Sequence, residues 1–178
     1  MCDYPGLDAI LLHMTAGTAE AKFANEVIPC LVAVWADDYA GTVPGSEIVE
    51  TTVERFSYLF DIKEQRLIAA WGISRGRQVS KRDASRMAGH PQSAGKWYHR
   101  GHAIAHTLGG GTDINLVAQL GSVNMGPFRS LEREAINTPG ALYFTYWTYD
   151  QSNTQKPIGV QQGLLVPGRP ANLRRHAN

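Results

Sequence analysis

The spacing of hydrophobic and polar residues changes several times along the chain, and each change predicts an element. Residues Gly17–Val27 are rich in Ala, Glu and Lys and predict a short helix. Two apolar runs, Ile28–Trp35 and Leu67–Trp71, have the length of core strands. The β-rich runs Thr52–Asp61 and Arg66–Ile73 flank a short polar turn and predict a β-hairpin.

The middle of the chain predicts a strand, a glycine loop, a strand and a helix in that order. Trp97–Ala105 is the first strand and Ile114–Leu120 is the second strand. The glycines at Gly109–Gly111 predict a break between the two strands. A helix opens at Asn124–Gly126, because Pro127 suits a first helical turn and apolar residues follow at helical spacing. Asparagine is also a favoured helix N-cap, so this residue type alone does not indicate a ligand.

The rest of the chain predicts strands at the end and loops between. Alternating aromatic and apolar residues predict strands at Ala141–Tyr149 and Ile158–Val166, followed by a polar, frayed tail. Asp38–Glu47 predicts a loop, and Arg75–Lys96 predicts a long surface loop with one helical turn at Lys81–Met87. We therefore expect an α+β fold with a mixed or antiparallel sheet and a strand–loop–strand–helix unit at about residues 97–138.

Length and composition fit one globular domain. The expected division is an acidic segment at 1–50 packed on the same domain, a main domain at 51–170, and a polar tail at 171–178. No apolar run approaches the ~20 residues that cross a bilayer. The first basic residue is Lys22, so a charged signal-peptide start is missing, and we expect either a cytoplasmic protein or export without a cleaved signal. Cys2 and Cys30 leave a disulfide and two free thiols both open.

Charge is divided unevenly between two segments. Residues 1–50 hold eight acids and one base, whereas residues 75–100 hold seven bases and one acid. A basic segment of this density can follow a polyanion, although a solvated basic loop has the same composition. Four of its residues are our candidates for nucleic-acid binding: Arg75, Arg77, Lys81 and Arg82.

The segment after this basic loop carries the residue types that phosphodiester hydrolysis needs. The reaction requires a base for the attacking water, a hard cation that offsets charge on the phosphate, and a cationic side chain that holds the substrate. Histidine suits the first role because its pKa lies close to neutral pH. An amide oxygen and a carboxylate suit Mg²⁺, which prefers oxygen ligands and keeps several waters.

The order and spacing of these residues resemble a known family. Arg100-Gly101-His102, then Asn115 and Gln119, then Asn124, then Leu131-Glu132 are similar to the DNA/RNA non-specific endonucleases of the ββα-metal, or His-Me finger, superfamily. The similarity covers roughly residues 70–166, with its specific signal in 98–132. It implies a sugar-non-specific endonuclease that cuts DNA, RNA or both and leaves 5′-phosphate ends, with Mg²⁺ as cofactor and Mn²⁺ as a substitute.

The resemblance also assigns roles. It implies His102 as general base, Asn124 as direct metal ligand and Glu132 as an outer partner of the metal's water shell. Arg100 would contact the phosphate. Spacing of eight residues puts Asn124 and Glu132 on nearly the same face of a single helix.

Three further positions complete the resemblance. Asn115 and Gln119 would support the site rather than react, and His99 stands where the family usually has aspartate. This difference at His99 bears on how the side chains of the site are oriented and on their affinity for metal or phosphate.

Other interpretations remain at this level. His99, His102 and His106 could suggest zinc, but strand alternation puts His99 on the opposite face and no fourth ligand is evident. His106 alone fits packing at a strand end.

A protein of this fold could also bind nucleic acid or a protein partner without efficient cleavage. The family includes antibacterial toxin modules bound by immunity or inhibitor proteins, and the sequence fits such a module, a phage enzyme or a housekeeping enzyme equally.

Overall fold

The fold is described from a computed structural model. It describes residues 3–79, 91, 94–150 and 154–178. The predicted helical turn at Lys81–Met87 lies outside these residues, as do Lys81 and Arg82 themselves. Cys2 also lies outside them, while Cys30 is an exposed free thiol.

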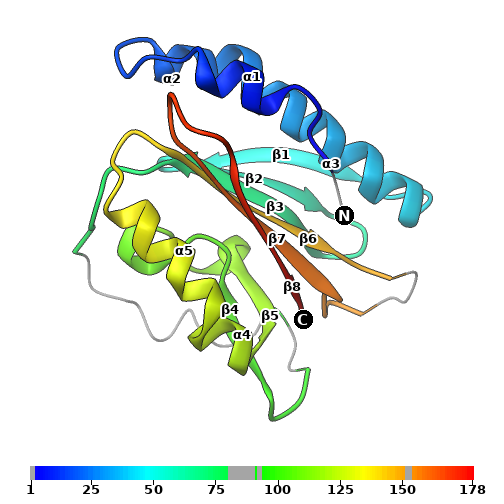
Figure 1. The fold of residues 1–178 in the computed structure, drawn as a ribbon. Coiled ribbons are helices and arrows are strands. Elements are labelled where there is room, and N and C mark those ends of the chain that lie inside the picture. Colours follow the sequence, from blue (N-terminus) through cyan, green and yellow to red (C-terminus); the bar gives the residue numbers. More distant parts are fainter. Residues whose placement is uncertain (1–2, 80–90, 92–93, 151–153) are drawn as a thin grey trace.

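A six-stranded sheet forms the centre of the molecule (Figure 1), and all of its neighbouring strands are antiparallel. The strand order is β1-β2-β3-β6-β7-β8. The strands span β1 Ile48–Val53, β2 Phe56–Asp61, β3 Arg66–Ile73, β6 Leu142–Thr148, β7 Gly159–Leu165 and β8 Asn172–Ala177.

The predicted hairpin is confirmed as β2 and β3, but its first run holds two strands. Residues 48–53 form β1, and the chain turns before β2 at Glu54, whose φ is 57°. The predicted strands at 141–149 and 158–166 are β6 and β7, each slightly shorter than expected.

Both faces of the sheet are covered, which explains the continuous apolar runs in its central strands. On one face, the rings of Phe144 and Tyr146 contact Trp35 of the N-terminal helical layer. On the other face, Trp147 contacts Phe128. The sheet is therefore the middle of three layers.

Helices from the first fifty residues form the layer on one face (Figure 1). They are α1 Leu7–Leu12, α2 Ala19–Lys22, the π-helical turn η1 Phe23–Val27, and α3 Ile28–Thr42.

The core strand expected at Ile28–Trp35 was wrong, because this run is the first half of α3. Leu31, Trp35 and Tyr39 are buried at four-residue intervals, which is a helical and not a strand spacing. The loop expected at Asp38–Glu47 begins only after Thr42, where α3 ends.

The C-terminal residues are ordered, which corrects the prediction of a frayed tail at 171–178. They form the edge strand β8, which pairs with β7 from Asn172 to Ala177. Its inward side chains are polar and find polar partners: Arg174 pairs with Glu134, and the His176 ring bonds to the side-chain oxygen of Gln162 at 2.9 Å. Because these inward residues are not apolar, the sequence lacks the usual alternation of a half-buried strand.

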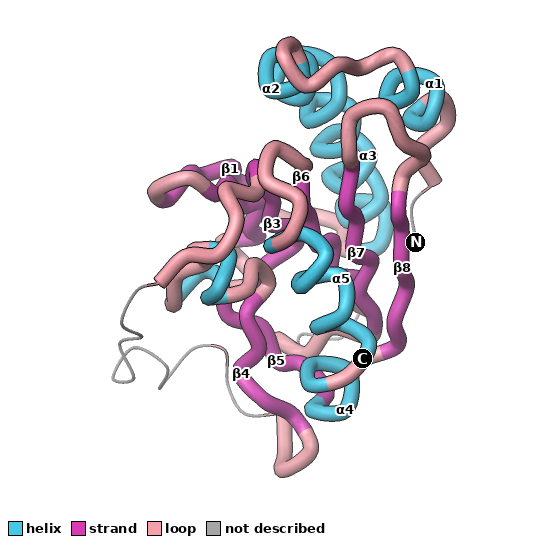
Figure 2. Tube along the Cα trace, turned by 60° about the vertical axis from the view of Figure 1, so that its left-hand side comes forward, coloured by secondary structure: helices cyan, strands magenta, loops and turns pink. Residues whose placement is uncertain are grey.

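The third layer is the strand–loop–strand–helix unit that the sequence predicted (Figure 2). β4 Tyr98–His102 and β5 Leu116–Leu120 form a separate two-stranded antiparallel ribbon. Between them lie the 3₁₀ turns η3 His106–Leu108 and η4 Asp113–Asn115, and after them come α4 Gly121–Met125 and α5 Pro127–Ile136. The fold is thus α+β, as expected.

Asn178 joins this unit to the sheet. Its side-chain amide donates to the carbonyl of Ala118 on β5 at 2.9 Å, and its oxygen accepts from the backbone NH of Leu120 at 2.7 Å. The same amide donates to the carbonyl of Pro157, just before β7. These contacts hold β5 against the end of the sheet. No helix among the described residues has both the length and the apolar character needed to span a membrane.

Candidate active site

One hollow of about 270 Å³ lies between the β4–β5 ribbon and the two following helices. It collects side chains from β4, from the turn η3 and from both helices. The polar and charged residues that line it are His99, Arg100, His102, His106, Thr107, Asn124, Arg129 and Glu132. The structure therefore brings His102, Arg100, Asn124 and Glu132, the residues that the resemblance singled out, into one pocket.

Asn124 and Glu132 reach this pocket from two different helices, which corrects the expected geometry. Asn124 is in α4, which ends at Met125, and Glu132 is in α5, which begins at Pro127. The N-cap position of α5 is Gly126 and not Asn124, so the capping role is also wrong. The break at Gly126, with φ −107° and ψ −111°, reorients the chain so that both side chains face the same hollow.

His102 is the last residue of β4 and is half-buried at the edge of the pocket. The preceding Gly101 allows a close packing contact between the two strands. A Cβ atom at this position would lie 2.9 Å from the Cβ of Gln119 and would overlap its side-chain oxygen. Glycine is thus required beside the histidine for steric reasons.

Asn115 and Gln119 are both fully buried in the ribbon, next to the pocket and not in it. The Asn115 amide donates to the carbonyls of Ile104 and Gly111, and its oxygen accepts from the NH of Ile104, all at 2.8 Å. These bonds fix the chain just after His102. The Gln119 amide lies over Gly101, and neither of its polar atoms has a hydrogen-bond partner among the described residues.

His99 lies in the same pocket as His102 and His106, although strand alternation predicted the opposite face. Its ring packs at the start of α4, where a Cβ on Gly121 would lie 2.9 Å from the His99 Cε1 atom. Among the described residues no group of three His, Cys, Asp or Glu side chains is placed to hold a metal, so the three histidines do not form a zinc site.

The arginines predicted to bind the substrate occupy different positions. Arg100 lines the pocket, and its Nε donates to the carbonyl of Pro91 at 3.0 Å. Arg75 does not line it, because its exposed guanidinium pairs with Glu20 of α2. Arg77 is exposed and is also outside the pocket lining.

Two basic residues of the pocket, His106 and Arg129, were given no part in the chemistry from the sequence. The ring of His106, expected to serve packing, lies 6.2 Å from the ring of His102. Arg129 is exposed on α5, one helical turn before Glu132. Its three-residue separation from Glu132 was a usable signal, because residues i and i+3 share a helix face.

Burial raises the pKa of Glu132 to about 7, and the nearby Arg129 opposes that rise. A carboxylate in such surroundings lacks solvent that would stabilise its charge. A bound cation would supply that stabilisation. Glu132 and the amide of Asn124 provide oxygen donors of the type that Mg²⁺ prefers, and a small set of protein donors suits an ion that keeps most of its waters. The residues present therefore fit a hard divalent cation.

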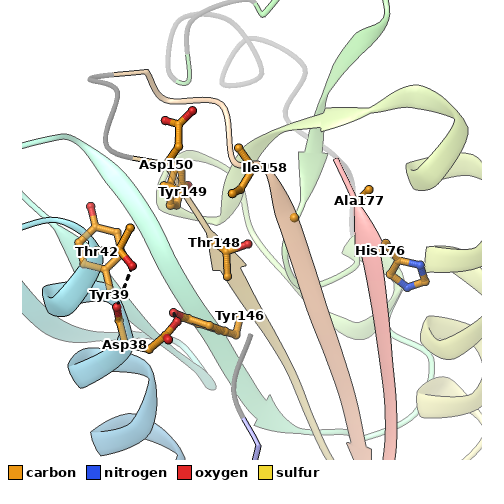
Figure 3. A pocket seen from close by; sticks show the side chains of 11 residues that line it. Asp38, Tyr39, Thr42, Tyr146, Thr148, Tyr149, Asp150, Ile158, His176 and Ala177 are labelled. Atoms are coloured by element: carbon orange, nitrogen blue, oxygen red, sulfur yellow. Dashed lines mark hydrogen bonds between the residues drawn. The ribbon is translucent and has the colours of Figure 1, made fainter.

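A second hollow, of about 580 Å³, lies on the other face of the sheet, between α3 and the ends of β6, β7 and β8 (Figure 3). Three tyrosines line it, together with the carboxylates of Asp38 and Asp150. None of its described lining residues is a lysine or arginine. Its charge is unsuited to a polyanion, so the pocket of His102 is the candidate active site.

The pocket lies within the part of the chain that matches a family model. Residues 67–140 match the model of the DNA/RNA non-specific endonuclease family. Among curated proteins, none is similar enough to count as a relative. Two solved structures of NucA from Streptococcus agalactiae are similar to this chain. The form with no metal bound is 14% identical with a TM-score of 0.49, covering 81% of this chain and 88% of that one. The form with a magnesium ion bound is 15% identical with a TM-score of 0.49, covering 82% and 88%.

The matched segment contains β3 except its first residue, the whole β4–β5–α4–α5 unit and every residue that lines the pocket. Over this segment the chain is similar to the DNA/RNA non-specific endonucleases.

Proposed function

We propose that this protein is a metal-dependent, sugar-non-specific endonuclease that hydrolyses phosphodiester bonds of DNA, RNA or both. The observation that carries the proposal is the convergence of His102, Asn124 and Glu132 with the two arginines in one pocket. The proposed cofactor is Mg²⁺, with Mn²⁺ as a substitute, and the products carry 5′-phosphates.

His102 acts as the general base in this proposal. Its imidazole takes a proton from the water that attacks phosphorus, as a new P–O bond forms and the bond from phosphorus to the 3′ oxygen breaks. A neutral imidazole can do this near pH 7. The turn fixed by Asn115 and the glycine at 101 hold this ring at the pocket edge.

Asn124 and Glu132 would hold the cation between them. When bound, Mg²⁺ supplies positive charge that offsets the charge developing on the phosphate. The Asn124 amide oxygen would be the direct ligand, and the Glu132 carboxylate would accept hydrogen bonds from the water molecules of the ion. The guanidinium groups of Arg100 and Arg129 bind phosphate oxygens and position the strand.

The first test is incubation of the purified protein with supercoiled plasmid and with total RNA, in Mg²⁺, in Mn²⁺ and in EDTA. We expect cation-dependent degradation that His102→Ala lowers by about 10²- to 10⁴-fold. His13→Ala is a matched control, because His13 is exposed at the end of α1 and is not part of the pocket. Equal inertness of the wild-type protein and His102→Ala in both cations would refute catalysis and favour binding without cleavage.

His106 needs a separate variant, because its ring shares the pocket with that of His102. If His102 is the base, His106→Ala keeps the larger part of the activity and the same pH profile. Loss of activity in His106→Ala with retention in His102→Ala would transfer the role to His106.

A further inference from the structure

A group of aromatic and basic side chains lies where the chain enters β4. The side chain of Trp97 is 69% exposed. Every other phenylalanine, tyrosine or tryptophan side chain among the described residues is buried or half-buried. The ammonium group of Lys96 lies 4.7 Å from the centre of its ring. Tyr98, half-buried at the start of β4, has the ammonium group of Lys156 at 4.7 Å from its ring centre.

The backbone holds this group beside the pocket. The carbonyl of Trp97 accepts a hydrogen bond from the NH of Gly121 at 2.9 Å, and the NH of Tyr98 donates to the carbonyl of Gly95 at 3.0 Å. Gly121 begins α4, the helix that carries Asn124. His99, two residues after Trp97, packs its ring against Gly121 and lines the pocket.

An exposed tryptophan ring offers a large flat apolar surface, and a ligand that stacks on it removes that surface from water. Here the Lys96 ammonium group lies over the Trp97 ring and the Lys156 ammonium group over the neighbouring Tyr98 ring. The adjacent pocket has a polyanion as its proposed substrate. Ammonium groups attract the phosphates, and flat aromatic rings stack on nucleobases irrespective of base identity. Both features suit a nucleic-acid strand.

We propose that Trp97 and Tyr98, with Lys96 and Lys156, form a stacking platform for unpaired bases of the strand that enters the pocket. The proposal rests on the proposed nuclease function and adds a substrate class to it. Bases in a duplex are already paired and stacked within the helix, so only an unpaired base can lie on such a ring. The platform therefore favours single-stranded DNA or RNA over duplex.

Tryptophan fluorescence tests the platform directly. Trp35, Trp71 and Trp147 are buried, so Trp97 is the solvent-exposed fluorophore. The His102→Ala protein in EDTA, which avoids cleavage, is titrated with single-stranded oligo(dT) and with a duplex hairpin of equal nucleotide number. We expect oligo(dT) to quench the fluorescence and to bind more tightly than the hairpin.

Variants give the quantitative test by fluorescence anisotropy of a labelled oligonucleotide. Trp97→Ala is expected to weaken oligo(dT) binding by about tenfold and hairpin binding much less. Trp97→Phe keeps most of the affinity while losing the quenching signal. Val53→Ala, at an exposed position on β1, is the control for loss of an exposed apolar side chain and leaves binding unchanged.

The platform and the nuclease function can fail separately. Binding of oligo(dT) without quenching, or with the same affinity in Trp97→Ala, would overturn the platform even if the protein cuts plasmid and RNA. This is also the result expected if Trp97 serves a protein partner. Quenching and Trp97-dependent binding in a protein that never cleaves would uphold the platform and refute catalysis.

Discussion

Arg129 and Glu132 lie one turn apart on α5 and face the same pocket, where the guanidinium opposes the rise in the pKa of the half-buried carboxyl group. Arg129 is thus the cation of α5 that is placed to meet a phosphate. Arg133, on the same helix, is exposed and does not line the pocket.

We expect Arg129→Gln to raise KM and to lower kcat/KM by roughly tenfold or more, because a charge-assisted hydrogen bond to phosphate contributes about 1.5–3 kcal/mol. The slope of log K for oligonucleotide binding against log salt concentration should fall by about one. Arg133→Gln is the matched control. Equal effects of the two substitutions would mean that Arg129 acts only through net charge.

The raised pKa of Glu132 predicts a dependence of stability on pH in the metal-free protein. The folded state holds a proton on this carboxyl up to a pH of about 7, whereas the unfolded state loses it near 4.5. The contribution of Glu132 to stability is therefore present below pH 4.5 and is lost as the pH rises to about 7, by about 3 kcal/mol.

Urea unfolding in EDTA at several pH values measures this contribution as the difference between the wild-type protein and Glu132→Gln. We expect the difference to change in favour of Glu132→Gln as the pH rises. Addition of Mg²⁺ at pH 8 should stabilise the wild-type protein more than the variant. A difference that is constant with pH would show that Glu132 is well solvated.

The contact between Gly101 and Gln119 predicts coupling between the two strands of the ribbon. Gly101→Ala should cost about 1–3 kcal/mol of folding free energy, because the new methyl group overlaps the side chain of a fully buried glutamine. The cost should be smaller in a Gln119→Ala background, where the overlapping amide is gone. A double-mutant cycle by urea unfolding measures the coupling, and additive effects would contradict the packing described.

Asn115 should be essential for the stability of the turn that follows His102. Asn115→Ala removes three hydrogen bonds to the backbone and is expected to cost about 2–4 kcal/mol, because buried NH and carbonyl groups lose their partners. Hydrogen exchange of the Ile104 amide should accelerate with it. Asn137→Ala, at an exposed asparagine that follows α5, is the control. Unchanged exchange at Ile104 would refute this structural role.

Local sequence patterns were sufficient for elements whose apolar spacing is unambiguous. The β2–β3 hairpin and α5 follow directly from such spacing. Local patterns were insufficient for α3, because its apolar run fits a strand and a helix equally. They were also insufficient for β8, whose inward residues Arg174 and His176 are polar and have polar partners across the fold. Those partners are distant in sequence, so no local pattern contains them.

The same limit applies to the pocket. The resemblance grouped His102, Asn124 and Glu132, whereas the helical spacing of Asn124 and Glu132 predicted one helix where the structure has two. His106 lines the pocket because the turn η3 places it there, and the exposure of Trp97 depends on how the chain approaches β4. These are properties of tertiary packing.

The placement of charge on the two sides of the sheet has a consequence for encounter with substrate. The helical layer on one side holds five acids and one base between Leu7 and Thr42, and the arginine-bearing pocket unit lies on the other side. Such an arrangement gives the molecule an electric dipole. A polyanion therefore exerts a torque at a distance that turns the pocket toward it, so that fewer collisions occur on the unproductive side, and this orienting effect weakens as ionic strength rises.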